Sequence, residues 1–264
     1  MSSQEIVEVA GRKVDLNRAG TGSPLLYLHS SLGEVWMPEF LEAITERREV
    51  FLPAHPGFGE STGIEEIADI EDLAFHYCLF ADEVLGAGTP FDLVGVSFGG
   101  WIAAEIAVRW PERLRSLTLI DPVGIWVPEH PIAPIWGIER EDLARLLFED
   151  LEHPLARMIL SVDLDDPPPE EVLLPFISSQ AATAKIAWNP YMHNPKLAGR
   201  LWRIKASTLF VWGKSDRLVP PQYGERFASL IPGARLETVP GGHMCCLERP
   251  SEVGRLLDDF IPIA

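Results

Sequence analysis

The chain is predicted to be an α/β protein whose sheet is mostly parallel and covered by helices on both faces. Short runs of β-branched and aliphatic residues alternate with longer segments of helical periodicity. This alternation is typical of parallel sheets, because neighbouring parallel strands are joined by a crossover that is usually a helix. A single long segment, residues 122–203, lacks a clear strand and interrupts the pattern.

The predicted strands are apolar runs, as expected where helices cover both faces of a sheet. An opening hairpin is predicted from two short runs, 6–9 and 13–16, with Gly11 between them. The remaining strands are predicted at 24–29, 49–53, 91–96, 117–120, 207–213 and 235–239. Helices of the core are predicted at 37–47, 67–85, 98–110, 221–230 and 251–260.

The segment 122–203 is predicted to form a helical cap inserted into the core. It is rich in proline and tryptophan, and it contains helical patterns at 140–151 and 170–187. A stretch of this length is too long to be a plain loop in a compact protein. The predicted division is therefore a core made of residues 1–121 and 204–264, with a cap of residues 122–203.

The composition of the chain disfavours several classes of binding partner. The 264 residues carry a formal net charge of −17, which disfavours nucleic acid and anionic membrane surfaces. Three cysteines, two of them adjacent, favour neither a disulfide framework nor a metal site. The first residues do not resemble a signal peptide, and no apolar run approaches the roughly 20 residues of a membrane span. We expect a cytoplasmic monomer or homodimer that acts on a small molecule.

Ser97 is the predicted nucleophile. It lies in a Gly-Val-Ser-Phe-Gly motif at 95–99, between a predicted strand and a predicted helix. A nucleophile elbow needs this arrangement, because the sharp turn lifts the serine hydroxyl above the sheet. Glycine on both sides allows the turn and the close packing of the helix on the strand.

A serine hydroxyl needs a base, and the base needs a carboxylate to orient it. His243 follows a Pro-Gly-Gly sequence just after the last predicted strand, so it is the predicted base. Asp216 follows the preceding strand, at the edge of the sheet where active-site groups of α/β proteins gather. Asp121, at the end of another strand, is a competing carboxylate; the chain order Ser97, Asp216, His243 favours Asp216.

Acyl transfer also needs donors for a developing oxyanion. The backbone N–H of Phe98, directly after the nucleophile, is one predicted donor. The second is predicted to be the N–H of Ser31, in the His-Ser-Ser-Leu-Gly loop that begins at His29. The alternative is that this loop merely connects a strand to a helix.

The motif around Ser97, the segment 213–220 and the Gly-Gly-His loop together resemble the α/β-hydrolase superfamily, in its branch of lid-bearing esterases and carbon–carbon bond hydrolases. Pro-Gly-Phe-Gly-Glu-Ser at 56–61 is similar to the loop after the fourth strand in that branch. The resemblance covers almost the whole chain. It implies an eight-stranded, mostly parallel sheet, a helical cap between strands six and seven, and no metal or organic cofactor.

Three positions depart from the pattern of that branch. His29-Ser30 stands where a His-Gly pair is usual in that branch. Ser30 therefore replaces the glycine, and serine resists backbone angles that glycine accepts. Met244 follows the predicted base where hydrolases of ring-fission products typically carry tryptophan, which favours ester hydrolysis over carbon–carbon cleavage. Ala54 and His55 stand where an acidic residue is common.

The predicted substrate is a small to medium carboxylic ester with an apolar part. Candidate contacts to it are Ser30, Met244 and aromatic residues of the cap, which alternatively pack the cap's own core. The aromatic candidates are Trp126, Trp136 and Trp188, with Tyr191 and Met192 beside them in the sequence.

Two other functions stay open, because a fold alone does not give a function. One is another reaction at the same triad, either carbon–carbon hydrolysis of a vinylogous diketone acid or a lyase reaction such as hydroxynitrile cleavage. A basic cap residue aimed at the site would favour the diketone; the candidates are Arg140, Arg145, Arg157, Lys185 and Lys196. The other is a ligand receptor with low turnover.

Overall fold

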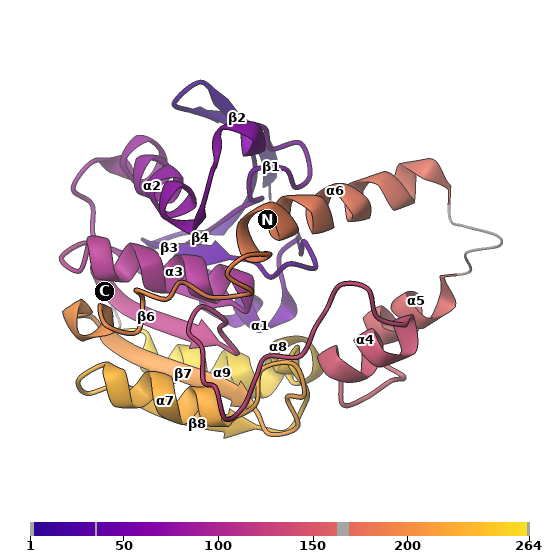
Figure 1. Cartoon of the computed structure of the whole chain (residues 1–264). Helices are drawn as coiled ribbons and strands as arrows, with labels where there is room; N and C mark the ends of the chain where they lie inside the picture. The colour runs from indigo at the N-terminus through magenta and orange to yellow at the C-terminus, as the bar shows by residue number, and fades with distance from the viewer. Residues whose placement is uncertain (1–2, 35, 163–168, 263–264) are drawn as a thin grey trace.

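The structure, a computed structural model, describes residues 3–34, 36–162 and 169–262. Within these residues eight strands form one sheet in the order β1-β2-β4-β3-β5-β6-β7-β8 (Figure 1). The strands are β1 Ser3–Val9, β2 Arg12–Gly20, β3 Ser23–Leu28, β4 Arg48–Pro53, β5 Phe91–Val96, β6 Leu114–Ile120, β7 Ser207–Gly213 and β8 Arg235–Val239. β2 pairs antiparallel with β1 and β4, and the other pairings are parallel. The predicted eight-stranded, mostly parallel sheet is confirmed.

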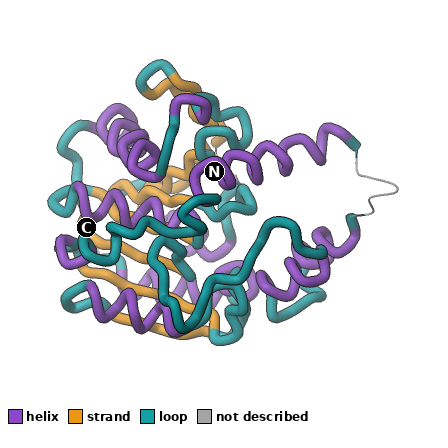
Figure 2. Tube along the Cα trace, in the orientation of Figure 1, coloured by secondary structure: helices purple, strands orange, loops and turns teal. Residues whose placement is uncertain are grey.

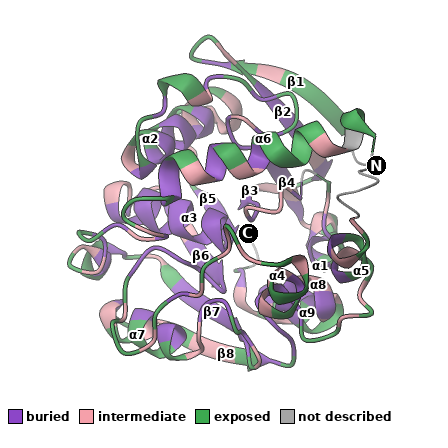
Figure 3. Cartoon of the chain, turned by 45° about the vertical axis from the view of Figure 1, so that its right-hand side comes forward, coloured by how far each residue is buried: buried purple, intermediate pink, exposed green. Residues whose placement is uncertain are grey.

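Burial follows position in the sheet. Every residue of the central strand β5 is buried, whereas most of the edge strand β1 is exposed. Figure 3 shows the same contrast between the central strands with α3 (Phe98–Arg109) and the periphery. The apolar runs in the sequence therefore mark strands that lie between two layers of helices.

The helices of the core lie on both faces of the sheet (Figure 1). α2 (Ile70–Phe80) packs on α3, and α7 (Gln222–Leu230) packs on β7 and β8. α1 (Glu39–Glu42) packs on α9 (Pro250–Phe260), and the short helix α8 (Cys245–Glu248) precedes α9.

Two helices predicted for the core differ clearly from the observed ones. The helix predicted at 37–47 is only the four residues of α1 followed by a 3₁₀ turn, Ala43–Glu46. The helix predicted from residue 67 begins at Ile70, because the Asp69 carboxylate accepts the N–H groups of Glu71 and Asp72 as an N-cap. After Phe80 it continues as a π-helix, Ala81–Gly86.

Between β6 and β7 the chain forms three α-helices in its described residues: α4 (Arg140–Leu147), α5 (Pro154–Ser161) and α6 (Glu170–Ala187). α6 has the predicted bounds, and α4 is shorter than the predicted 140–151. A long irregular stretch leads from β6 to α4 (Figure 2). These helices lie beyond the edge where the parallel strands end (Figure 1). No helix in the described part of the chain is both long and apolar enough to cross a bilayer.

Candidate active site

Ser97 lies on a strained turn between β5 and α3. Its φ is 52° and its ψ −113°, a combination rare for any residue with a side chain. The flanking glycines are required by close approach: a Cβ on Gly95 would lie 2.4 Å from the Gly99 carbonyl oxygen, and one on Gly99 would lie 2.1 Å from that of Leu28. The local sequence therefore permits the tight packing of α3 on the sheet that this turn needs.

The three residues predicted as a triad are brought together in one hydrogen-bonded chain. His243 Nε2 is 2.7 Å from Ser97 Oγ, and His243 Nδ1 is 2.8 Å from Asp216 Oδ2. The second carboxylate oxygen of Asp216 accepts the N–H groups of Leu218 and Val219 at 2.9 and 2.8 Å. All three residues are buried. The carboxylate is thus fixed by backbone donors, and it orients the imidazole toward the hydroxyl.

Asp121 lies beside Asp216 and does not replace it at the base. Its carboxyl accepts the N–H of Gly213 at 2.9 Å and the thiol of Cys245 at 3.0 Å. It is fully buried at a φ of 44°. Burial first, and then the charge of Asp216, raise the pKa of Asp121 well above its usual value. Sequence reasoning missed that these two carboxyl groups are neighbours.

The two predicted oxyanion donors lie on different elements. Phe98 begins α3, and its N–H has no acceptor among the described residues. Ser31 lies in the loop after β3, where its carbonyl accepts the Gln180 amide at 2.9 Å and its N–H is likewise without an acceptor in the described chain. Ser30 avoids the strain expected at its position, because the residue of this loop with positive φ is Gly33, at 77°.

A network of buried aromatic residues holds that loop. His55 donates from its backbone N–H to His29 Nε2 at 3.1 Å, and its Nε2 lies 2.9 Å from the His29 carbonyl oxygen. The Tyr77 hydroxyl bonds His55 Nδ1, and His29 Nδ1 lies 2.7 Å from the Ser30 carbonyl oxygen. Burial lowers the pKa of His29 to about 4 and that of His55 well below its usual value, so both rings are neutral. This network accounts for His55, whose role the sequence left unexplained.

The loop that carries His243 is tied to the segment between α4 and α5. The buried Glu248 carboxylate accepts the N–H of Gly242 at 2.6 Å with one oxygen. With the other it accepts the N–H groups of Glu149 and Asp150 at 3.0 and 2.7 Å. The placement of α4 and α5 is therefore coupled to the residue that precedes His243. The sequence signal for this contact was only a glutamate close after the histidine.

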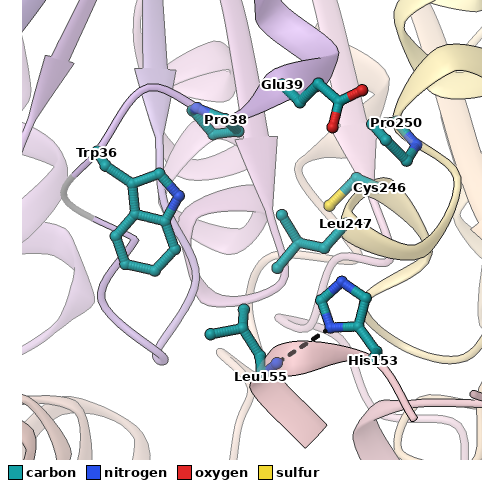
Figure 4. A pocket seen from close by; sticks show the side chains of 8 residues that line it. All are labelled: Trp36, Pro38, Glu39, His153, Leu155, Cys246, Leu247 and Pro250. Carbon is teal, nitrogen blue, oxygen red and sulfur yellow. Dashed lines mark hydrogen bonds between the residues drawn. The ribbon is translucent and has the colours of Figure 1, made fainter. Parts of the chain in front are cut away.

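A cavity of about 230 Å³ lies between the loop after β3, the start of α5 and α8. Figure 4 shows Trp36, Leu155, Leu247 and two prolines around a common space, together with the polar or ionisable side chains of Glu39, His153 and Cys246. Its lining residues are Trp36, Pro38, Glu39, His153, Leu155, Cys246, Leu247 and Pro250. Ser97, His243 and Asp216 are not among its lining residues, although Cys246 and Leu247 closely follow His243 in the sequence.

None of the predicted substrate-contact residues is among the lining residues of this cavity. Trp136 packs its ring against Trp188 and Tyr191, and Trp126 packs against His193, so the ring contacts of these residues in the described chain lie within 122–203. Met244 is buried, and its backbone N–H donates to the Leu147 carbonyl at 2.9 Å. Ser30 turns its hydroxyl to Glu34, at 2.6 Å.

Known proteins resemble the chain over most of its length. It is 30% identical over 268 residues to a 2-hydroxymuconate semialdehyde hydrolase of Pseudomonas putida, covering 96% of this chain and 92% of that one. It is 29% identical to the biotin biosynthesis bifunctional protein BioHC of Teredinibacter turnerae, with 90% of this chain aligned; the chain spans only 44% of that protein. A solved thermophilic esterase from Thermogutta terrifontis is similar with a TM-score of 0.70 and 25% identity, over 97% of both chains.

The sequence model of the alpha/beta hydrolase family matches residues 22–256. That match includes β3 to β8, the loop of Ser31 and the three hydrogen-bonded residues Ser97, His243 and Asp216. The fold, with its eight-stranded, mostly parallel sheet, agrees with it. The chain belongs to the alpha/beta hydrolase family.

Proposed function

We propose that the protein is a serine hydrolase that cleaves a small to medium apolar carboxylic ester through an acyl-enzyme on Ser97. The observation that carries this proposal is the hydrogen-bonded chain from Ser97 Oγ through His243 to Asp216 Oδ2. Such a chain makes a serine hydroxyl nucleophilic, because the imidazole accepts its proton as the oxygen attacks.

The reaction follows from this geometry in two steps. Ser97 Oγ attacks the acyl carbon while His243 Nε2 takes its proton, and the N–H groups of Phe98 and Ser31 face the developing oxyanion. His243 then returns the proton to the leaving alcohol, which leaves the acyl group on Ser97. Water, deprotonated by His243, attacks this acyl-enzyme and releases the carboxylic acid and the free serine. Asp216 stabilises the protonated imidazole in both steps.

The cavity beside α5 supports an apolar substrate. Its walls include Trp36, Leu155 and Leu247, and residues of this kind favour aliphatic or aromatic groups over charged ones. We propose that it takes the apolar part of the ester. The residues 122–203 act as the cap that supplies one of its walls.

Carbon–carbon hydrolysis on the same triad is the second candidate. The observation that favours it is the similarity to the 2-hydroxymuconate semialdehyde hydrolase, which aligns over nearly its full length. The esterase proposal draws matching support from the similarity to the thermophilic esterase. The two reactions share the nucleophile and base, so the substrate decides between them.

The test is turnover of p-nitrophenyl acetate, butyrate and octanoate, with 2-hydroxymuconate semialdehyde assayed in parallel. Ester turnover that is lost in Ser97→Ala supports the proposal. Asp216→Asn is expected to lose activity by at least about 100-fold, while the matched variant Asp121→Asn keeps most of it. Turnover of the semialdehyde without any ester hydrolysis would transfer the proposal to carbon–carbon cleavage.

A further inference from the structure

Glu34 is a buried carboxyl in the loop after β3, outside the triad. Its side chain is 1% exposed. Among the described residues, the cationic group whose charge acts on Glu34 is protonated His243. A buried carboxyl without a permanent counter-ion costs stability, so its place in the loop of Ser30 and Ser31 calls for a functional explanation.

Both donors of Ser30 are directed to this carboxyl. The Ser30 N–H lies 3.0 Å from Glu34 Oε2, and its hydroxyl lies 2.6 Å from Oε1. The Ser30 hydroxyl also accepts the N–H of Leu32 at 3.0 Å, and the Ser30 carbonyl accepts that of Gly33 at 3.2 Å. With its own N–H engaged, Ser30 is not an oxyanion donor, whereas the N–H of Ser31 has no acceptor among the described residues.

The hydrogen bonds from Ser30 favour the charged form of this carboxyl. Burial raises the pKa of Glu34, while its hydrogen bonds from Ser30 oppose that rise. The two contacts with Ser30 therefore offset part of the cost of burying the carboxyl, and they tie it to the loop that carries Ser31.

We propose that Glu34 is a positioning residue for the hydrolysis at Ser97, an inference that rests on the proposed function. It fixes the oxyanion loop through both donors of Ser30, so that the Ser31 N–H faces the reacting carbonyl. The serine that replaces the usual glycine is then required, because its hydroxyl supplies the second bond to Glu34.

The test measures the rate at which a p-nitrophenyl alkylphosphonate reacts with the protein, followed by release of p-nitrophenolate as a function of pH. This reagent needs the nucleophile and the base but no knowledge of the natural substrate. Glu34→Gln is expected to react about tenfold more slowly, equivalent to about 1.4 kcal/mol, since its amide nitrogen cannot accept from Ser30. Glu34→Asp, which keeps two carboxylate acceptors, should react faster than Glu34→Gln. Ser30→Ala should be about threefold slower than the wild type, and the exposed Glu42→Gln should match the wild type.

The amplitude of the release counts reactive sites and separates positioning from simple misfolding. A loss in amplitude alone, with the rate of the remaining sites unchanged, would overturn the inference. A wild-type rate in Glu34→Gln would overturn it as well. If the wild type itself is not phosphonylated above the Ser97→Ala blank, the proposed function fails first.

Discussion

Asp121→Asn is expected to stabilise the protein, by an amount that grows with pH. Asp121 is fully buried beside Asp216, and both burial and that neighbouring charge raise its pKa. Asparagine has nearly the same shape, and it keeps an acceptor for the Gly213 N–H that lies at 2.9 Å. It also tolerates the left-handed backbone at φ 44° better than most residues. The substitution therefore removes the titration with little change in packing.

The sign follows from proton binding. The folded protein keeps a proton on Asp121 that the unfolded chain releases above a pH of about 4. Between that pH and the raised pKa of Asp121, the wild type loses up to about 1.4 kcal/mol of unfolding free energy per pH unit through this group. The variant has no such proton. Its advantage is expected to grow by up to about 2.7 kcal/mol from pH 5 to pH 7.

Urea denaturation at several pH values between 4.5 and 8 measures this difference directly. Asp259→Asn, at an exposed aspartate of α9, is the matched control and should run parallel to the wild type. If the curves of Asp121→Asn and wild type are parallel, or converge as the pH rises, then Asp121 does not hold a proton in the folded protein.

Three further substitutions test other contacts. Tyr77→Phe removes the donor to His55 Nδ1, so we expect a loss of about 1–3 kcal/mol in unfolding free energy by urea denaturation; unchanged stability would contradict the network. Glu248→Gln weakens the tie between the histidine loop and the segment that joins α4 to α5, so kcat for p-nitrophenyl butyrate should fall several-fold with little change in KM, whereas the exposed Glu152→Gln should behave as wild type. Leu155→Trp fills part of the 230 Å³ cavity, so octanoate turnover should fall relative to acetate; an equal effect on both esters would place the acyl chain elsewhere.

The parts of the structure that sequence predicted well depend on local patterns. Apolar runs mark the buried strands, and the motif at 95–99 identifies the turn of Ser97, because only glycine fits between α3 and the sheet. The order Ser97, Asp216, His243 sufficed to choose three residues that the fold brings into one hydrogen-bonded chain. Their catalytic roles remain predictions.

The parts that sequence reasoning missed depend on contacts between distant residues. His55 bonds Tyr77, which is 22 residues away, and no local pattern indicates that pair. The helix predicted at 37–47 is broken into α1 and a 3₁₀ turn, since tertiary packing overrides a weak helical pattern. Trp136 and Trp188 were candidates either for substrate contact or for packing within residues 122–203; their rings contact each other, and a contact with substrate stays a prediction.

The most direct test of the account is a mass spectrum of the protein quenched in acid after mixing with p-nitrophenyl trimethylacetate, whose bulky acyl group slows the second step. The account predicts one added acyl group, located on the peptide that contains Ser97 and absent from Ser97→Ala. An acyl group on any other residue, or ester hydrolysis that continues in Ser97→Ala, would contradict it.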